Sequence, residues 1–284
     1  MDIWNNTKVS ICGCGWLGAP LAAQLVALGA EVWGSRQQKE DVEALAAMGV
    51  HGVKLQLPLD VASSSCLADF FTTDVLVINV PPGRQTGAVP AWQKNVGQLI
   101  AAARHYGTQR IIFISTTAVY GGITGTVVES TPVQPETASG HAHAQMEQHV
   151  LQQWGEDAVV LRLAGLIGPG RHPVRFLSGR EGILQGGDRV NLIHQHDCIQ
   201  AIKRIIQQWP GGQVLHLAAP EHPSRARYYC HMAAQAGLPL PQFIPETEEA
   251  VQARGCKVID AQATCELLDL TLTHPDLMAY MPEI

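Results

Sequence analysis

Charged residues are scarce: Lys, Arg, Asp and Glu make up 15% of the 284 residues, and the formal net charge is −6. A chain with this balance lacks the basic face that nucleic acids and anionic membranes require, so we expect neither as a partner. The sequence also lacks an uninterrupted apolar run of about 18 residues, which a membrane-spanning helix needs. Its N-terminus has no basic stretch followed by an apolar one, so we expect no secretory signal.

Cysteine occurs without a pairing pattern. Seven cysteines lie scattered along the chain, and none forms a CxxC pair. The sequence therefore indicates neither a zinc site nor a disulfide framework, and reduced thiols are typical of a soluble cytoplasmic protein. Apolar residues, in contrast, make up 46% of the chain. That content is enough to bury a sizeable core, which excludes a disordered chain.

Short apolar runs alternate with stretches of helical periodicity in the first part of the chain. The runs VLVINV at 75–80 and RIIFI at 110–114 are continuous, as in parallel strands that are covered on both faces. Strands are predicted at 8–12, 30–33, 53–57, 75–80, 110–114 and 158–163, and helices at 17–28, 40–48, 92–106 and 141–154. Strands alternating with helices form right-handed crossovers, so the pattern predicts an α/β fold with a Rossmann-type, doubly wound parallel sheet.

The turn between the first strand and the first helix carries the sequence GCGWLG, a G-x-G-x-x-G pattern. The first glycine permits a tight turn, the second lets the backbone approach a pyrophosphate, and the third lets helix and strand pack closely. The helix N-terminus is then aimed at the anion. We therefore predict a dinucleotide site made by Gly13, Gly15, Trp16, Leu17 and Gly18.

The end of the second strand lacks an acidic residue. NAD-binding proteins usually place a carboxylate there for the ribose 2′-hydroxyl, whereas this chain has Ser35 and Arg36. A hydroxyl and a guanidinium suit a 2′-phosphate, because arginine forms forked, charge-assisted bonds with phosphate. The sequence therefore favours NADP over NAD as the cofactor. Val80 and Pro81 end a later strand and are expected to lie against the cofactor through mainly apolar contact.

The regular alternation weakens after about residue 165, where glycine and proline become frequent. We interpret this change as the start of a second, looser part of the chain. The predicted organisation is an NAD(P)-binding Rossmann domain at 1–164, to which 190–218 returns, and a small C-terminal α/β substrate lobe at 165–189 and 219–284.

Several motifs follow the glycine turn in order: STTAVYG at 115–121, TVVESTPVQP at 126–135, LRLAG at 161–165, IGPGR at 167–171 and HQHD at 194–197. In this order the chain resembles the extended short-chain dehydrogenase/reductases, the NAD-dependent epimerase/dehydratase type. The resemblance implies an NAD(P)-dependent enzyme that oxidises and re-reduces a sugar carbon of a nucleotide sugar, or reduces a carbonyl. It also implies that Thr116 hydrogen-bonds the reacting oxygen. Thr117 stands where dehydratases place an acid, which argues against sugar dehydration and leaves Thr117 as a substrate contact.

The chain departs from this family at its catalytic pair. Family enzymes carry Tyr-x-x-x-Lys on the helix that follows the serine/threonine strand, and Ser139 and His143 stand in those two places here. No tyrosine of this sequence has a lysine four residues later, so the pair has not shifted elsewhere. Ser139 and His143 are one helical turn apart and share a face.

Three interpretations of this face stay open. In the first, the enzyme still transfers hydride, with His143 titrating near neutrality as acid or base, acting through Ser139 or water. In the second, the fold binds NADP but has lost or altered its redox catalysis, and acts as a sensor or binding module. In the third, His141, His143 and His149 are polar residues on a helix face.

Two further groups lie beyond the first domain. Arg171 and His172 follow a Pro-Gly turn at the mouth of the expected cleft, where they would grip an anionic substrate; otherwise Arg171 caps a helix end. His194 and His196 alternate on a strand-like run beside Asp197, which invites a metal. Family members carry a similar segment without metal, so we expect no metal site.

The sequence as a whole predicts an NADP-preferring oxidoreductase or epimerase-like enzyme that acts on an unidentified small molecule in the cytoplasm. The alternatives are a catalytically impaired NADP-binding protein and a structural or partner-binding protein whose glycine turn is a relic. Family members often dimerise through helices like those at 92–106 and 141–154, so the resemblance suggests a homodimer.

Overall fold

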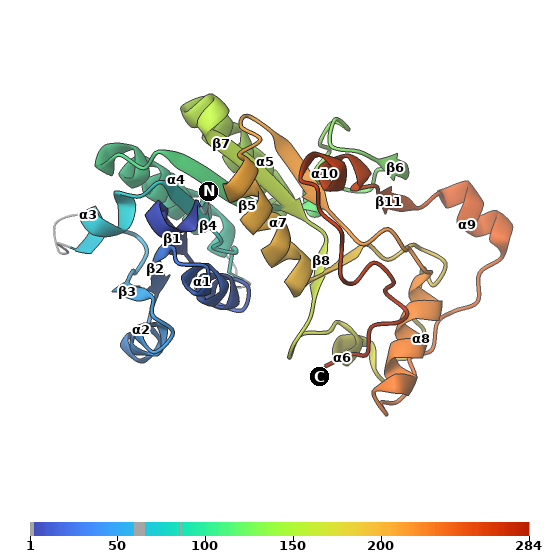
Figure 1. The fold of residues 1–284 in the computed structure, drawn as a ribbon. Coiled ribbons are helices and arrows are strands. Elements are labelled where there is room, and N and C mark those ends of the chain that lie inside the picture. Colours follow the sequence, from blue (N-terminus) through green and yellow to red (C-terminus); the bar gives the residue numbers. More distant parts are fainter. Residues whose placement is uncertain (1–2, 60–65, 84, 86, 284) are drawn as a thin grey trace. The chain divides into compact units, whose positions relative to one another are not determined.

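The computed structural model describes residues 3–59, 66–83, 85 and 87–283. Its central element is a seven-stranded sheet with the order β10-β7-β5-β4-β1-β2-β3 (Figure 1). The strands are β1 (Lys8–Cys12), β2 (Glu31–Arg36), β3 (His51–Lys54), β4 (Val75–Ile78), β5 (Arg110–Thr116), β7 (Ala158–Leu163) and β10 (Val214–Leu217). β1 pairs in parallel with β2 and β4, β2 with β3, and β4 with β5. The predicted α/β, doubly wound parallel sheet is confirmed.

The position of β1 in this sheet fixes where a ligand would bind. β2 lies on one side of β1 and β4 on the other, so the strand order reverses at β1. In open α/β sheets, ligands bind beyond the carboxyl ends of the strands at such a reversal. The segments that follow β1, β2 and β4 therefore meet at one edge of the sheet.

The helices follow the strands along the chain. They are α1 (Gly18–Ala27), α2 (Lys39–Ala46), α3 (Cys66–Phe71), α4 (Ala88–Tyr106), α5 (Ala138–Trp154), α6 (Val174–Leu177), α7 (Gln195–Gln208), α8 (Arg225–Gln235), α9 (Glu248–Arg254) and α10 (Gln262–Leu267). α4 begins at Ala88, earlier than the sequence predicts, because a proline is tolerated in the first turn of a helix and Pro90 lies there. β2 is longer than predicted and ends at Arg36.

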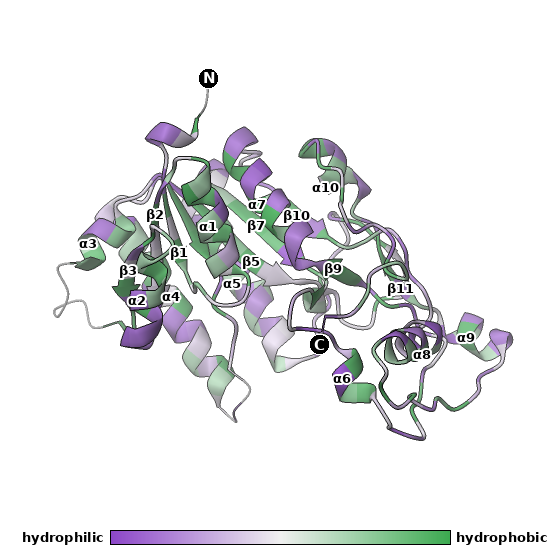
Figure 2. Cartoon of the chain, turned by 60° about the horizontal axis from the view of Figure 1, so that its bottom comes forward, coloured by the Kyte–Doolittle hydropathy of each residue, from purple (hydrophilic) through white to green (hydrophobic). Residues whose placement is uncertain are grey.

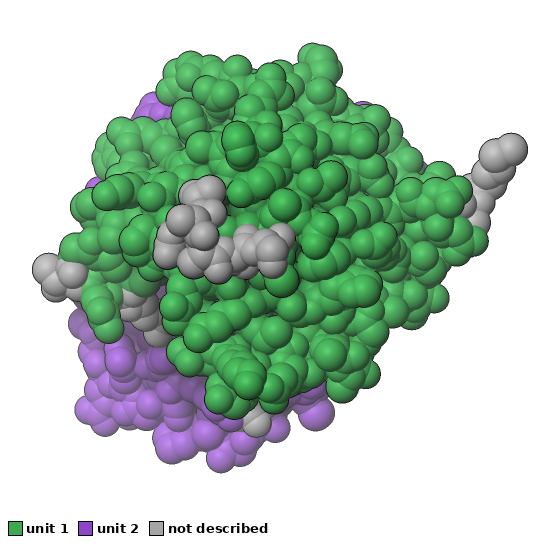
Figure 3. Space-filling view, turned by 90° about the vertical axis from the view of Figure 1, so that its left-hand side faces the viewer, with its two compact units in different colours: residues 1–115, 137–161, 203–214 green, residues 116–136, 162–202, 215–284 purple. Residues whose placement is uncertain are grey.

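The chain divides into two compact units (Figure 3). The first unit holds residues 1–115, 137–161 and 203–214, and the second holds 116–136, 162–202 and 215–284. These boundaries differ from the predicted domains chiefly in giving 116–136 and 190–202 to the second unit. The segment 190–202 contains β9 and the first half of α7, so the boundary falls within a regular helix, and composition alone does not reveal it.

Each unit has its own core. In the first unit, α4 and α5 pack on one face of the sheet through a large apolar cluster that includes Trp92, Val96, Leu99, Val150 and Trp154. The strands that they cover are mostly hydrophobic (Figure 2), and every residue of β7 is buried, as expected for strands covered on both faces.

The second unit contains two short parallel pairs. β6 (Gly125–Val127) pairs with β11 (Lys257–Ile259), and β8 (Gly165–Ile167) pairs with β9 (Leu192–His194). Its core is built on α8 and includes Val174, Tyr228, Met232 and Leu277. Within the described ranges, no helix has both the length and the apolar character needed to cross a membrane.

Candidate cofactor site and catalytic groups

The glycine turn after β1 is shaped by close backbone contacts. Gly13 has a φ of +100°, and a Cβ at this position would lie 2.4 Å from the carbonyl oxygen of Asn79, beyond β4. A Cβ on Gly18 would lie 2.4 Å from the Gly13 carbonyl oxygen. Neither position tolerates a larger residue without a shift of the backbone. These contacts give the turn its tight course and let α1 pack closely on β1.

Gly15 differs from the other two glycines because its surroundings are open. The nearest atom to a Cβ at Gly15 is Nη1 of Arg36, at 3.7 Å. α1 follows with Leu17 as its N-cap, which is buried and supplies no side-chain hydrogen bond, and the first turn of α1 has no acidic residue. The positive end of this helix dipole is therefore not neutralised by a carboxylate of its own first turn. Such a turn suits an anion.

Hydrogen bonds fasten the turn to the ends of β2 and β4. The N–H of Gly13 donates to Oγ of Ser35 (3.1 Å), and the N–H of Cys14 donates to the Ser35 carbonyl oxygen (3.0 Å). The side-chain amide of Asn79 donates to the Gly13 carbonyl oxygen (3.2 Å). Ser35 is buried. Its hydroxyl thus holds the glycine turn in place, in addition to the ligand contact that the sequence suggests.

Arg36 extends from the end of β2 to the glycine turn. Its Nη1 donates to the carbonyl oxygen of Cys14 (2.7 Å), and its Nη2 lies 2.7 Å from Oδ2 of Asp41. Asp41 lies in the first turn of α2. The prediction for Arg36 rests on the strand end alone and does not include Asp41. An acidic residue in the first turn of the next helix is the signal that would have found it.

The thiols beneath the turn are inert. Cys12 and Cys14 are buried, and burial raises the pKa of each to about 12. Both therefore stay protonated at neutral pH, and a protonated thiol is a poor nucleophile. The thiols therefore offer no reactive group at the turn.

The segment after β4 borders the turn. Cγ2 of Val80 would lie 3.5 Å from a Cβ at Gly13. The Val80 carbonyl oxygen accepts a hydrogen bond from Nε1 of Trp92 (2.7 Å), which ties this segment to α4. Val80 and the predicted cofactor residue Trp16 are half-buried, and Pro81 is exposed. The apolar surface that the sequence predicts here is thus present beside the turn.

His143 lies in the interior of the first unit. Only 6% of its surface is exposed, and its ring centroid lies 4.5 Å from that of Trp92 and 6.4 Å from that of Phe113. The interpretation of His143 as a residue of a polar helix face is therefore wrong, because α5 turns this position toward α4. Its neighbour His141 is exposed.

The hydrogen bonds of His143 define which ring nitrogen is free to react. Nδ1 lies 2.8 Å from the carbonyl oxygen of Ser139 and 3.4 Å from Ser139 Oγ. A carbonyl oxygen only accepts, so Nδ1 carries the hydrogen and Nε2 has the lone pair of the neutral ring. Burial lowers the pKa of His143, against smaller opposing effects of the Ser139 bond and of Glu147. The neutral ring therefore predominates at pH 7.

A buried carboxylate lies one turn further along α5. Glu147 is buried and accepts a short hydrogen bond from the hydroxyl of Ser115, near the end of β5. This pair fixes α5 against β5, because separating a buried carboxylate from its donor is costly. Ser139 and His143, which precede Glu147 on the same helix, are positioned by that contact. Sequence analysis gave Glu147 no such role.

The predicted residues Thr116 and Thr117 belong to the second unit. Oγ1 of Thr116 accepts a hydrogen bond from the N–H of Ala118 (3.1 Å) and thereby caps a short 3-10 helix, Thr117–Tyr120. The Thr116 hydroxyl keeps its own hydrogen for donation, and its side chain is half-buried, whereas Thr117 is buried. Thr116 is the better placed of the two to donate to a ligand.

Tyr120 is not available as a substitute acid. The phenol is fully buried; it accepts a hydrogen bond from Nη1 of Arg162 (2.9 Å) and lies 3.0 Å from Nδ1 of His216. Nε2 of His216 in turn lies 2.6 Å from the carbonyl oxygen of Asp260. These bonds tie together four segments of the second unit, which is a structural role.

Arg171 and His172 differ in their surroundings. Arg171 is exposed and ends a tight turn closed by two backbone hydrogen bonds with Gly168, of 3.0 and 2.9 Å. His172 is buried; its Nδ1 accepts from the N–H of Val174 (3.2 Å), and its Nε2 donates to the hydroxyl of Tyr228 (2.9 Å). Burial lowers the pKa of His172 to about 4. His172 is therefore a neutral, fully bonded ring that supports the turn carrying Arg171.

The strand-like run predicted around His194 and His196 is shorter than expected. β9 ends at His194 and α7 begins at Gln195, so the two histidines do not share one face of a strand. Both carboxylate oxygens of Asp197 accept backbone hydrogen bonds, from the N–H groups of Thr273 (2.7 Å) and His274 (3.1 Å). In the part of the chain that the structure describes, no three His, Cys, Asp or Glu side chains form a metal-binding group.

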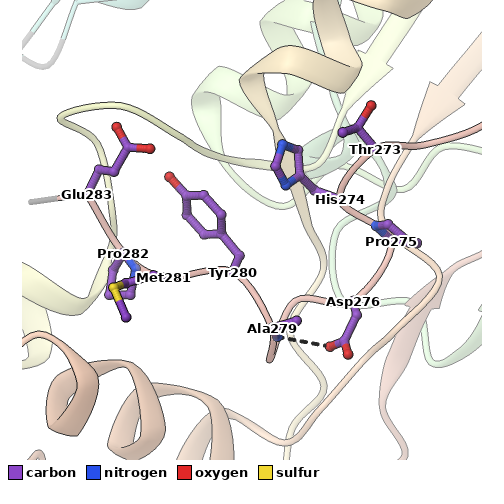
Figure 4. Close-up of a pocket in the computed structure, with 9 residues that line it drawn as sticks. All are labelled: Thr273, His274, Pro275, Asp276, Ala279, Tyr280, Met281, Pro282 and Glu283. Atoms are coloured by element: carbon purple, nitrogen blue, oxygen red, sulfur yellow. Dashed lines mark hydrogen bonds between the residues drawn. The ribbon is translucent and has the colours of Figure 1, made fainter.

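An open pocket of about 540 Å³ lies along residues 273–283 of the second unit (Figure 4). The rings of His274 and Tyr280, both among the residues that line it (Figure 4), lie edge to face with centroids 5.6 Å apart. The ring of His194 packs on both, at centroid distances of 3.8 Å and 4.7 Å. Nε2 of His194 and the hydroxyl of Tyr280 are buried and have no hydrogen-bond partner among the described residues. Burial lowers the pKa of His194 to about 4, so this cluster is sensitive to acid.

The structure thus brings together the predicted residues of the glycine turn, the end of β2 and the end of β4, and it joins Ser139 to His143. Thr116, Thr117, Arg171 and His172 lie in the other unit. A parallel sheet whose first turn has this geometry defines a Rossmann-type dinucleotide-binding protein. The chain belongs to the NAD dependent epimerase/dehydratase family, whose sequence profile matches residues 11–218.

Known proteins resemble this chain over almost its whole length. "Protein YeeZ" of Escherichia coli (strain K12) is 38% identical over 270 residues, which cover 95% of this chain and 97% of that protein. The structure of a functionally unknown conserved protein from Silicibacter pomeroyi DSS has a TM-score of 0.73 at 25% identity and covers 96% of each chain. UDP-glucuronic acid 4-epimerase from Bacillus cereus, solved in complex with NAD, has a TM-score of 0.76 at 19% identity, covering 95% of this chain and 93% of that chain. Family membership gives this chain an oxidoreductase- or epimerase-type function that depends on a nicotinamide dinucleotide.

Proposed function

We propose that the protein binds NADP(H) in preference to NAD(H) and uses it to oxidise or reduce a small molecule, either a nucleotide sugar or a carbonyl compound. The observation that carries the preference is the Arg36 guanidinium, 3.7 Å from the Cβ position of Gly15, at a strand end without an acidic residue. A 2′-phosphate on the adenosine ribose would gain charge-assisted hydrogen bonds from this group. A 2′-hydroxyl would gain much less.

The residues of the first unit fit a nicotinamide dinucleotide. Gly15 leaves open the space that a side chain would fill, and the first turn of α1 carries no acidic residue that would repel an anion. The backbone of 13–18 would hold the pyrophosphate, Arg36 the 2′-phosphate, and Val80 and Pro81 would add apolar contact. The bound cofactor supplies the acceptor or donor of hydride.

The chain's own residues must hold the substrate oxygen and move a proton. Within the first unit, we assign the proton transfer to Nε2 of His143, since Nδ1 is bound to the Ser139 carbonyl oxygen. The role of Thr116, which lies in the second unit, stays a prediction from the family resemblance. Ser139 thereby fixes the ring. Because burial lowers the pKa of His143, the neutral base predominates at pH 7. That state suits removal of a proton from an alcohol, the direction of oxidation.

An anionic group in the substrate is part of the proposal. Arg171 is exposed at the end of a tight turn, and its guanidinium suits a phosphate or carboxylate. His172 supports this turn through its hydrogen bonds with Val174 and Tyr228. Thr117 is buried, and its substrate contact stays a prediction from the sequence.

A second function is favoured by the burial of His143. A ring packed against Trp92 and only 6% exposed exchanges protons with a substrate less readily than a tyrosine of lowered pKa. An NADP-binding protein without standard redox chemistry, acting as a sensor or binding module, fits this observation. Stereospecific hydride exchange on NADPH across a panel of carbonyl compounds and nucleotide sugars separates the two. Exchange with any member supports the enzyme, and tight NADPH binding without exchange supports the sensor.

The cofactor preference is tested by titrating NADPH and NADH into the wild-type protein, Arg36→Ala and Lys39→Ala. Loss of a charge-assisted phosphate contact is expected to weaken NADPH binding about tenfold or more in Arg36→Ala. NADH affinity should change by no more than about twofold. Lys39→Ala serves as the matched control. Lys39 is 78% exposed at the start of α2, so this substitution removes a positive charge close to Arg36 in sequence. Tighter NADH than NADPH binding by the wild type, or full NADPH affinity in Arg36→Ala, contradicts the proposal.

A further inference from the structure

The Arg36 guanidinium already has an anionic partner in the protein. Asp41 Oδ2 lies 2.7 Å from Nη2, while Nη1 is held by the Cys14 carbonyl oxygen at 2.7 Å. The side chains of Arg36 and Asp41 are 30% and 44% exposed, so both can be reached from solvent. Asp41 thus occupies, with one oxygen, the kind of position that a phosphate oxygen would take on the same nitrogen.

We infer that Asp41 is a specificity-determining residue, which limits the preference for NADP(H) by competing with the 2′-phosphate for Arg36. The inference rests on the proposed NADP preference. A carboxylate and a phosphate dianion that share one guanidinium repel each other, and the phosphate gains less from an arginine whose charge is already neutralised. A ribose with a 2′-hydroxyl carries no such charge and does not feel this repulsion.

Asp41 also holds the guanidinium over Gly15, which by itself would favour phosphate binding. That benefit is small, because Arg36 keeps a second anchor in the Cys14 carbonyl oxygen, and an exposed ion pair contributes little to ordering a side chain. Repulsion between the carboxylate and a dianion acts at every geometry in which both lie near Arg36. The net effect of Asp41 is therefore weaker binding of NADPH.

Asp41→Asn is the informative substitution, because asparagine keeps an acceptor oxygen for Arg36 and removes only the charge. We expect NADPH to bind about fivefold more tightly to this variant at low ionic strength, with NADH affinity unchanged within about twofold. The gain should shrink as salt is raised, because the two charges are partly exposed. Glu40→Gln removes the same charge from the same first turn of α2; Glu40 is exposed, and this matched control should move NADPH affinity by less than about twofold.

The outcomes separate this inference from the proposed function. Unchanged or weaker NADPH binding in Asp41→Asn, while Arg36→Ala loses NADPH affinity, overturns the role of Asp41 and leaves the NADP preference standing. Weaker NADH binding in Asp41→Asn shows that Asp41 takes the ribose hydroxyls, which also overturns the inference. Full NADPH affinity in Arg36→Ala, or a wild type that binds neither nucleotide, overturns the proposed function and the inference with it. Thermal unfolding of each variant confirms that the affinities refer to folded protein.

Discussion

Acid should destabilise the second unit through His194. The ring is buried, and burial, followed by the nearby His274 and His196, lowers its pKa from 6.5 to about 4. Nδ1 accepts a hydrogen bond from the N–H of His196 (3.1 Å) and Nε2 has no partner among the described residues. None of the contacts described for this ring therefore stabilises an imidazolium.

The sign and size of the effect follow from linkage. Between pH 6.5 and 4 the unfolded chain binds a proton at this position that the folded chain does not, so stability falls as the pH is lowered through this window. The contribution of the neutral His194 ring to stability is fully present above pH 6.5. Going from pH 7.5 to 5.0 is expected to cost about 2 kcal/mol from His194 alone. His172, whose pKa is also lowered to about 4 by burial, adds a contribution of similar size.

Urea unfolding at pH 7.5 and 5.0 measures this cost, and far-UV circular dichroism is the suitable probe because all six tryptophans lie in the first unit. His194→Phe keeps an aromatic ring against His274 and Tyr280 but cannot titrate. The difference in unfolding free energy between the two pH values should therefore be about 2 kcal/mol smaller in this variant than in the wild type.

Ile193→Val provides the matched control, since Ile193 is the buried neighbour on β9. It should lower stability by about 1 kcal/mol at both pH values and leave the difference between them unchanged. If His194→Phe shows the same pH difference as the wild type, His194 is not responsible and the argument from its burial fails.

Two further sets of variants test the glycine turn and the catalytic assignment. Gly13→Ala should lower the free energy of unfolding by about 2 kcal/mol or more, because its Cβ meets a carbonyl oxygen at positive φ. Gly15→Ala has room for its Cβ, so its free energy of unfolding should lie within about 1 kcal/mol of the wild-type value. The same variant should bind NADPH at least about tenfold more weakly. Equal stabilities in urea, or unchanged NADPH affinity in Gly15→Ala, would refute this reading of the turn. His143→Phe keeps the packing on Trp92 and should abolish NADPH-dependent turnover while the protein stays folded; surviving turnover removes His143 from the mechanism.

The glycine turn was predictable because its determinants are local. Gly13, Gly15 and Gly18 are close in sequence, and each satisfies a backbone requirement of a single strand-to-helix turn. The alternation of strands and helices was predictable for the same reason, since apolar runs and helical periodicity are read within a few residues. β7, for example, has the bounds that the sequence predicts.

What the sequence could not reveal depends on packing between distant segments. The burial of His143 follows from the contact of α5 with Trp92 of α4, and periodicity alone leaves a histidine on either face of a short amphipathic helix. The hydrogen bond from His172 to Tyr228, which lies 56 residues further along the chain on α8, likewise follows only from the three-dimensional structure.

The interleaving of the two units has a consequence for how the chain is made. The last segment of the first unit, 203–214, supplies hydrogen bonds that the unit needs, among them one from the N–H of Val160 to the Gln213 carbonyl oxygen (3.0 Å) and one from Gly212 to Ala158 (2.9 Å). A ribosome must therefore synthesise about three quarters of the protein before the nucleotide-binding half can close its sheet. Nascent chains shorter than this leave the edge of β7 exposed. A fragment of residues 1–164 would keep this edge unpaired permanently.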